Sequence, residues 1–290
     1  MSKKERDKWL ANSTRKKETV IFHPLTIKSF PKYQFTQPSF LYYKKGVPTE
    51  QAWRELKIFE ALASSFKVSS GTFHDSWVYM TTVNSAFLIY PYLPLKEVVN
   101  NFPPTKQIFY KAADFKNRKI GWTDPYLDLV EAGMIVTVSC PVYYRDKLLG
   151  VICRDITLDQ LSKQTLNPFS DAKASLTCLI MDKNGLAIAN SQKSAMNEID
   201  TVNQKSGSAA LFYRNKQALP SLKVSNIQNS NTVLFNQIGS EVIHRIRQYP
   251  ARKTLNFRLN LLKHSISVSA TKVKSTGWLV VTFSIDSGFH

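Results

Sequence analysis

The 290-residue chain contains no stretch of about twenty consecutive apolar residues, so the sequence predicts no segment that spans a bilayer. Its first residues, Met-Ser-Lys-Lys-Glu, also lack the apolar core of a secretory signal peptide. We therefore expect this chain to be soluble as it stands. Hydrophobic residues still make up 43% of the sequence, which is enough for a packed core and excludes wholesale disorder.

Glycine and histidine are sparse, and the common catalytic motifs are missing. The 10 Gly are too few for many close approaches of backbone to phosphate, and the 5 His lie far apart without metal-ligand spacing. Gly-x-Ser-x-Gly, His-Glu-x-x-His and Gly-x-x-x-x-Gly-Lys do not occur. Asp124 and Asp128 form a carboxylate pair, but their setting is more typical of a binding loop. We expect no enzyme, no metal and no cofactor.

Cysteine is equally scarce, and its three positions do not define a compartment. Cys140, Cys153 and Cys178 cannot all pair within one chain, and their spacing matches no zinc site. Cys140 and Cys153 fall on two strands of a predicted hairpin, where they could lie close together. Burial of all three as small apolar side chains is the favoured interpretation.

Acidic residues are few, with 21 Asp and Glu against 39 Lys and Arg, which gives a formal charge of +18. Clustered positive charge favours nucleic acid, but here it is scattered and no nucleic-acid-binding motif occurs, so no such partner is expected. The densest basic stretch, between Lys3 and Lys17, is interpreted as a solvated tail. A basic face near anionic lipid is one alternative for the rest, and an ordinary solvated surface is favoured.

Helical and strand patterns alternate along the first half of the chain. Thr49 is a suitable N-cap for a helix whose apolar residues recur at helical spacing. Thr157 and Gln160 form a capping box that begins another helix. The expected elements are a helix at 49–67, strands at 77–83 and 86–90, a helix at 105–114, and a hairpin of strands at 134–143 and 147–154.

The second half repeats this order of hairpin, helix and strands. A turn at 182–185 separates two apolar strands, and the helix that follows carries its apolar residues on one face. The expected elements are strands at 176–181 and 186–189, a helix at 232–248, and strands at 254–262, 265–273 and 278–285. This repetition predicts two related α+β modules in tandem.

Several segments resemble the membrane-distal half of double Cache (dCache) sensor domains, in order and in mutual spacing. They are Leu-Ile-Tyr-Pro at 88–91, Phe-Tyr-Lys-Ala-Ala at 109–113, Trp-Thr-Asp-Pro-Tyr-Leu-Asp at 122–128, Thr-Val-Ser-Cys-Pro-Val-Tyr at 137–143 and Gly-Val-Ile-Cys-Arg-Asp-Ile at 150–156. The resemblance covers about a third of the chain well and the remainder more loosely.

The resemblance implies an α+β fold with an N-terminal helix and two tandem PAS-like modules, each an antiparallel sheet flanked by helices. The implied limits are 1–70 for the N-terminal segment, 71–165 for a distal module that binds a ligand, and 166–290 for a proximal module. Such domains are the periplasmic or extracellular portions of cytoplasmic-membrane receptors. Flanking transmembrane helices, absent from this chain, would attach it to the membrane and to an output domain, and a homodimer is a further option.

The resemblance also implies the residues of the ligand site. In members that bind amino acids, an aromatic pair, a Tyr-x-Asp segment and a later Asp form the pocket. These features correspond here to Phe109 and Tyr110, to Tyr126 and Asp128, and to Asp155. The chemistry agrees, because an ammonium group is recognised by carboxylates and aromatic faces.

Other interpretations of these side chains stay open. Asp155 follows an apolar strand, where an ionised side chain needs a partner, but it lies just before Thr157 and could cap a helix instead. Asp128 could simply bond to its own loop backbone. Trp122 is more typical of a core. Tyr79 and Tyr90 are further candidates for the pocket, although strand parity alone does not assign them.

One position departs from the amino-acid-binding pattern. Those members carry an Arg two residues before the aromatic pair, and that Arg holds the ligand carboxylate. Here the position is Gln107, preceded by Lys106; Gln brings no charge and Lys lacks the fork of a guanidinium. An amine, a decarboxylated or masked amino acid, or another small metabolite is therefore as plausible as an unmodified amino acid. The alternative function is a non-catalytic structural or protein-interaction module with a closed pocket.

Overall fold

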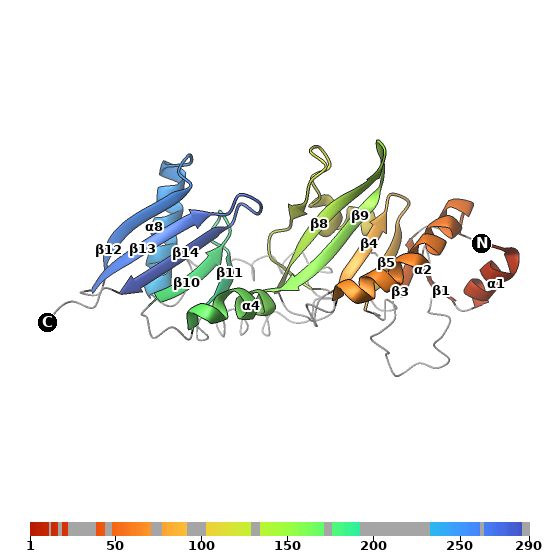
Figure 1. Cartoon of the computed structure of the whole chain (residues 1–290), viewed down its shortest axis with the longest axis horizontal. Coiled ribbons are helices and arrows are strands. Elements are labelled where there is room, and N and C mark those ends of the chain that lie inside the picture. Colours follow the sequence, from red (N-terminus) through yellow and green to blue (C-terminus); the bar gives the residue numbers. More distant parts are fainter. Residues whose placement is uncertain are drawn as a thin grey trace. The chain divides into compact units, whose positions relative to one another are not determined.

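The computed structural model describes eleven parts of the chain, and they form two compact units (Figure 1). The described residues are 1–11, 13–16, 19–22, 39–43, 48–70, 77–91, 103–128, 134–170, 176–191, 233–261 and 264–285. Unit 1 comprises Met1–Thr123 and Thr137–Ile156, and unit 2 comprises Asp124–Val136 and Thr157–His290. The expected module limits at 70 and 165 stay predictions.

The strands of the first half form a nine-stranded antiparallel sheet. Its order is β1-β2-β3-β5-β4-β9-β8-β6, and β7 also pairs with β8. The strands are β1 (Ser13–Lys16), β2 (Thr19–Phe22), β3 (Ser39–Tyr43), β4 (Val78–Thr82), β5 (Ala86–Tyr90), β6 (Gly121–Trp122), β7 (Tyr126–Leu127), β8 (Met134–Tyr144) and β9 (Lys147–Thr157). The helices are α1 (Lys3–Ala11), α2 (Glu50–Ser70), the 3₁₀ helix η2 (Pro104–Lys106) and α3 (Ile108–Lys111).

The predicted hairpins and the helix after Thr49 are confirmed. Strand β4 pairs antiparallel with β5, and the turn between them places Ser85 at φ 68°. The turn between β8 and β9 places Arg145 at φ 53°. Helix α2 begins beside Thr49, whose hydroxyl accepts the N–H of Ala52 at 3.3 Å. Polar turn residues therefore ended the strands where the sequence indicated.

Two predictions for this half need correction, and three strands were not predicted. The helix expected at 105–114 is η2 followed by α3, because Gln107 has an extended backbone (φ −73°, ψ 157°) and interrupts it. The basic stretch read as a solvated tail includes α1, whose Trp9 is buried in the core beside α2. Strands β1, β2 and β3 were not foreseen, because the sequence around them shows no clear apolar period.

Unit 2 is built around a five-stranded antiparallel sheet in the order β11-β10-β14-β13-β12. The elements are α4 (Leu158–Ser170), β10 (Leu176–Met181), β11 (Ala187–Asn190), α8 (Val233–Gln248), β12 (Thr254–Leu261), β13 (His264–Lys272) and β14 (Leu279–Ile285). The predicted turn is confirmed: Asp182 Oδ1 accepts the N–H groups of Asn184 at 2.8 Å and Leu186 at 2.7 Å, and Gly185 has φ 88°.

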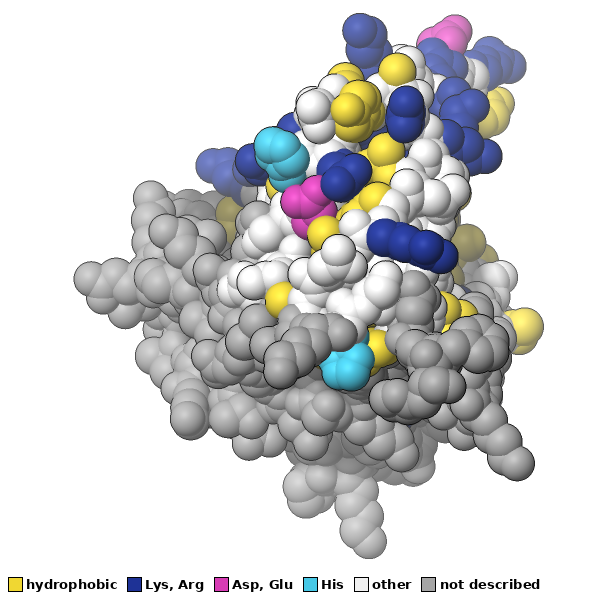
Figure 2. Space-filling view, turned by 90° about the vertical axis from the view of Figure 1, so that its left-hand side faces the viewer, with side chains coloured by type: hydrophobic (Ala, Val, Ile, Leu, Met, Phe, Trp, Pro, Cys, Tyr) yellow, Lys and Arg dark blue, Asp and Glu magenta, His cyan; other side chains and the backbone are white. Residues whose placement is uncertain are grey.

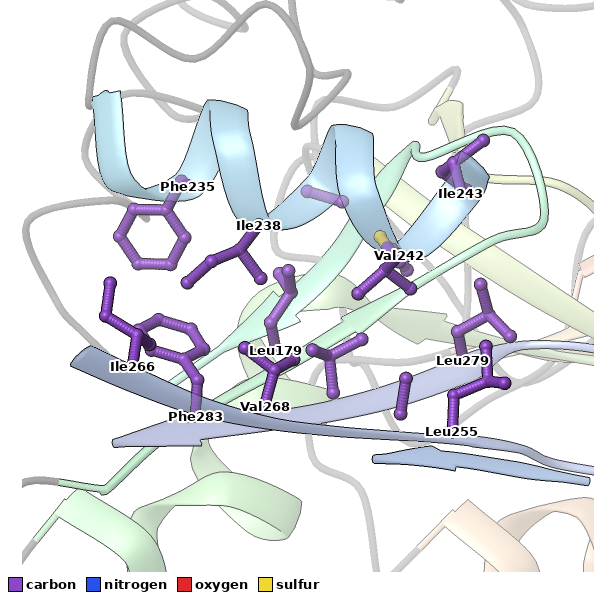
Figure 3. Close-up of a cluster of buried hydrophobic side chains, with 14 residues drawn as sticks. Leu179, Phe235, Ile238, Val242, Ile243, Leu255, Ile266, Val268, Leu279 and Phe283 are labelled. Atoms are coloured by element: carbon purple, nitrogen blue, oxygen red, sulfur yellow. The ribbon is translucent and has the colours of Figure 1, made fainter. Parts of the chain in front are cut away.

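The core of unit 2 lies between α8 and one face of this sheet (Figure 3). Phe235, Ile238 and Val242 point from α8 toward Val268 and Phe283 on the strands. The rings of Phe235 and Phe283 meet edge to face with centroids 5.7 Å apart. The amphipathic helix predicted from its apolar spacing thus covers the sheet. Each half of the chain has an antiparallel sheet with helices, which confirms the α+β fold of two tandem PAS-like modules.

No helix in the described parts of the chain is long and apolar enough to cross a membrane.

Candidate functional site

The two faces of the sheet in unit 1 have different neighbours. Side chains alternate along a strand, so Val78 and Met80 of β4 point to one face and Tyr79 to the other. Val78 and Met80 pack with Trp53 and Phe59 of α2. Tyr90 of β5 belongs to the same α2-facing core. Tyr79 is therefore the candidate on the far face, and Tyr90 is not.

Asp155 lies on β9 at this far face and is 5% exposed. Its Oδ1 accepts the hydroxyl of Tyr79 at 2.7 Å and the hydroxyl of Thr137 at 2.6 Å. Burying a carboxylate costs several kcal/mol unless donors compensate, roughly 3–5 kcal/mol when a partner is lost. The helix-cap position belongs to Thr157, whose hydroxyl accepts the N–H of Gln160 at 3.1 Å. Asp155 is thus a buried acceptor on the sheet face.

Three aromatic rings pack together on this face, and the hydroxyl of one of them, Tyr79, donates to the carboxylate. Tyr79 and Phe109 meet edge to face with ring centroids 4.9 Å apart, and Phe87 lies 5.5 Å from Tyr79 and 6.2 Å from Phe109. All three are buried, with exposures of 2–4%. Aromatic faces next to a carboxylate form a setting that suits an organic cation. Phe87 was missed in the sequence, where only its alternation along β5 could have indicated it.

Two features hold α3 against the sheet and so place Phe109. The Ser139 hydroxyl donates to the Phe109 carbonyl at 2.7 Å, and the Cys153 thiol lies 3.6 Å from that hydroxyl. A Cβ on Gly121 of β6 would lie 1.7 Å from the carbonyl oxygen of Ala112, so the backbones touch there and only Gly fits. Burial, followed by the charge of Asp155, raises the pKa of Cys153, which keeps its thiol neutral.

Gln107, Tyr110 and Trp122 also lie in unit 1, where Gln107 precedes α3, Tyr110 is on α3 and Trp122 is on β6. Gln107 is 9% exposed, and its side-chain Nε2 donates to the Pro103 carbonyl at 3.2 Å. Tyr110 is half-buried with its ring 5.6 Å from that of Phe115, and burial raises its pKa. Trp122 is half-buried and pairs with Val138 across β6 and β8.

Tyr126 and Asp128 are buried, at 5% and 6% exposure, but they belong to unit 2. Tyr126 pairs with Ile135 across β7 and β8. Their membership of the ligand site stays a prediction.

The three cysteines differ in their burial. All three are free thiols, and Cys153 and Cys178 are buried as expected, whereas Cys140 is exposed. Neighbouring residues of a strand point to opposite faces, so Cys140 points away from Ser139 and from Cys153. The predicted burial of Cys140 is therefore wrong, and Cys140 and Cys153 do not pair. The described residues hold no group of His, Cys, Asp or Glu suited to a metal ion.

In unit 2, the sheet face opposite α8 is hollowed. Side chains of β12, β13 and β14 that alternate with the core line an open groove of about 500 Å³. Asn256, Arg258, Ser267 and Thr282 add polar groups to a lining that also includes apolar residues such as Phe257 and Phe283. The face toward α8, by contrast, is filled by the hydrophobic core (Figure 3).

The fold and the matched sequence define a class of protein. Residues 92–163 match the family model described as the first PDC sensor domain of methyl-accepting chemotaxis protein-like receptors. Together with the two-module fold, this match confirms the resemblance to double Cache sensor domains of chemoreceptors.

Particular relatives can be named within that class. The methyl-accepting chemotaxis protein McpC of Bacillus subtilis is 31% identical over 88 residues, which are 30% of this chain and 13% of McpC. The ligand-binding domain of the Campylobacter jejuni chemoreceptor Tlp3, solved with L-norvaline, is 16% identical with a TM-score of 0.50, covering 83% of this chain and 77% of that domain. The ligand-binding domain of Pseudomonas fluorescens CtaA, solved with L-alanine, is 14% identical with a TM-score of 0.44, over 79% of this chain and 76% of that domain.

Proposed function

We propose that this chain is the extracytoplasmic ligand-sensing domain of a transmembrane signalling receptor, and that it binds a small metabolite without transforming it. The observation that carries the proposal is the buried Asp155 carboxylate, which accepts from Tyr79, whose ring packs with those of Phe87 and Phe109. The chain spans a small part of McpC, so the transmembrane helices, output domain and any homodimer of such a receptor belong to the proposal.

The ligand in this proposal carries an ammonium group. Asp155 supplies the negative charge, and aromatic faces favour a cation held next to them. Gln107 stands where amino-acid-binding members have Arg, and its amide is engaged by the Pro103 carbonyl. Without a guanidinium there, a ligand carboxylate gains no bidentate pairing. We therefore favour an amine, or a decarboxylated or masked amino acid, over an unmodified amino acid.

Thermal shift of the whole chain tests the proposal, with separate panels of amines, amino acids, purines and carboxylates. We expect a hit among the amines. Asp155→Asn keeps an acceptor for Tyr79 and Thr137 but removes the charge, so it should abolish the shift while circular dichroism shows an intact fold. Asp7→Asn, the same change at an exposed carboxylate of α1, is the matched control and should keep the shift. Ligand stabilisation that survives Asp155→Asn would show that the site is misplaced.

A second variant tests the ligand class. Gln107→Arg introduces the missing guanidinium and should add binding of α-amino acids, with a gain of about tenfold or more for one charge-assisted bidentate pair. An unchanged preference for amines over amino acids in this variant would contradict the role given to position 107.

One observation favours a structural or protein-interaction module with a closed pocket instead. Tyr79 and Thr137 already donate to Asp155, and the rings of Tyr79 and Phe109 touch each other, so this cluster satisfies part of its own chemistry. Silence of every panel in the thermal-shift screen would support this second function.

A further inference from the structure

The sequence from Val242 to Ile285 contains no Asp or Glu, although Lys and Arg recur throughout it. In unit 2 this stretch forms the end of α8 and the strands β12, β13 and β14. The preceding Glu241 pairs with Arg245 at 2.5 Å within the helix. No Asp or Glu separates the remaining cations of this stretch in the sequence. Asp182, which follows β10 at the same end of the sheet, is buried, so the exposed charges of this stretch are basic.

Five of these cations gather at one end of the sheet, which we name the basic end. It consists of Arg247, Arg252, Lys253, Lys272 and Lys274, all of them exposed. A backbone hydrogen bond links Lys253 and Lys272: the N–H of Lys272 donates to the Lys253 carbonyl at 2.9 Å. The loop from α8 to β12 and the turn from β13 to β14 therefore lie side by side. On the face drawn in Figure 2, Lys and Arg side chains clearly outnumber acidic ones.

Backbone hydrogen bonds hold this end in shape. The N–H of Tyr249 donates to the Arg245 carbonyl at 2.8 Å, and the N–H of Arg252 donates to the Tyr249 carbonyl at 3.1 Å. Across the second turn, the N–H of Val273 donates to the Trp278 carbonyl at 2.8 Å. The cations are thus presented by ordered turns, and binding through them requires little ordering of the backbone.

We propose that the basic end binds the anionic headgroups of a lipid bilayer. A soluble surface usually mixes charges of both signs, because one-signed clusters repel themselves. Tyr249 is 39% exposed with the Arg252 guanidinium 4.8 Å from its ring centroid, and an aromatic ring beside basic side chains is typical of a membrane interface. The groove of unit 2 lies on the sheet face, and none of the five cations lines it. The basic end is therefore a separate surface, formed by turns.

Vesicle co-sedimentation of the whole chain tests this proposal. We expect binding to vesicles of equimolar phosphatidylglycerol and phosphatidylcholine, loss of binding in high salt, and no binding to phosphatidylcholine alone. The triple variant Arg252→Gln, Lys253→Gln and Lys272→Gln should weaken binding about a hundredfold, since each basic side chain near an anionic surface contributes about fivefold. Circular dichroism checks that the variant is folded.

The matched control removes three exposed charges from unit 1, through Lys3→Gln, Lys4→Gln and Lys116→Gln, and should leave vesicle binding within about threefold. Equal losses in both triple variants would overturn the proposal in favour of overall charge. Absence of vesicle binding would overturn it in favour of a solvated surface, and tighter binding to a DNA duplex than to vesicles would identify a different partner. None of these outcomes bears on Asp155, so the proposed ligand sensing is tested separately.

Discussion

Tyr79→Phe removes a single hydroxyl that donates to the buried Asp155 carboxylate at 2.7 Å. A hydrogen bond to a charged group contributes about 2 kcal/mol, so the free energy of unfolding should fall by that amount. Thr137→Val removes the second donor, at 2.6 Å to the same oxygen, and should cost about as much. Both residues are almost fully buried, which limits compensation by water.

The double variant gives the sharper result. With one hydroxyl removed, the other still stabilises Oδ1; with both removed, the carboxylate has lost both of these donors. We expect the double variant to lose about 1 kcal/mol more than the sum of the two single variants. Urea unfolding of all four proteins, followed by circular dichroism, measures this coupling.

Two controls make the same chemical changes where no carboxylate accepts. Tyr143→Phe removes a hydroxyl that donates to the Phe115 carbonyl at 3.2 Å, and should cost about 1 kcal/mol or less. Thr81→Val replaces a buried hydroxyl that finds no partner among the described residues, and should be neutral or stabilising. Equal costs at Thr81 and Thr137, or additive losses at Tyr79 and Thr137, would refute the shared acceptor.

Two further predictions concern other buried groups of the chain. Glu55→Ala should lower the free energy of unfolding by about 3 kcal/mol, because buried Glu55 accepts from Thr82 at 2.9 Å and from Asn84 at 2.6 Å. Arg54→Ala, at an exposed neighbour, is the control. Equal effects of the two changes in urea unfolding would contradict the role of Glu55. Burial raises the pKa of Cys153 above its ordinary value of 9.0. Above about pH 9 the folded protein therefore keeps a proton that the unfolded chain releases. The free energy of unfolding should then fall by up to about 1.4 kcal/mol for each further pH unit. Cys153→Ala should flatten this dependence in unfolding series near pH 8 and pH 10, and an unchanged slope would count against it.

Local patterns predicted most of the elements that follow residue 48. Apolar spacing indicated α2 and α8, and polar turn residues indicated where the β4–β5 and β10–β11 hairpins end. The same signals failed around α3, because an extended Gln107 after two prolines divided a short stretch that looked helical. They also failed for β1–β3, which form strands through pairing: β3 pairs with β5, β2 with β3 and β1 with β2.

For the candidate site, the sequence indicated Asp155 and Phe109 and offered Tyr79 as a candidate, but it gave no role to Phe87 or Thr137. Phe87 lies outside the segments that carry the resemblance, and Thr137 lies in one of them without an expected role. They enter the site because β5, β4, β9 and β8 are neighbours in the sheet and their registers turn these side chains to one face. Tyr79 and Tyr90 were equal candidates until that parity separated them. Glu55 had no signal, since its partners lie on a hairpin about thirty residues away.

The amino-acid sequence by itself determined the alternation of helices and strands, the tandem repeat of modules, and a carboxylate at the end of an apolar strand. These properties depend on neighbours a few residues apart, which local spacing records. Only the tertiary structure decided that Tyr79 and Thr137 donate to Asp155 and that Lys253 lies beside Lys272 at the basic end. Those contacts depend on which strands pair and in what register, and pairing joins residues whose separation along the chain leaves no local pattern.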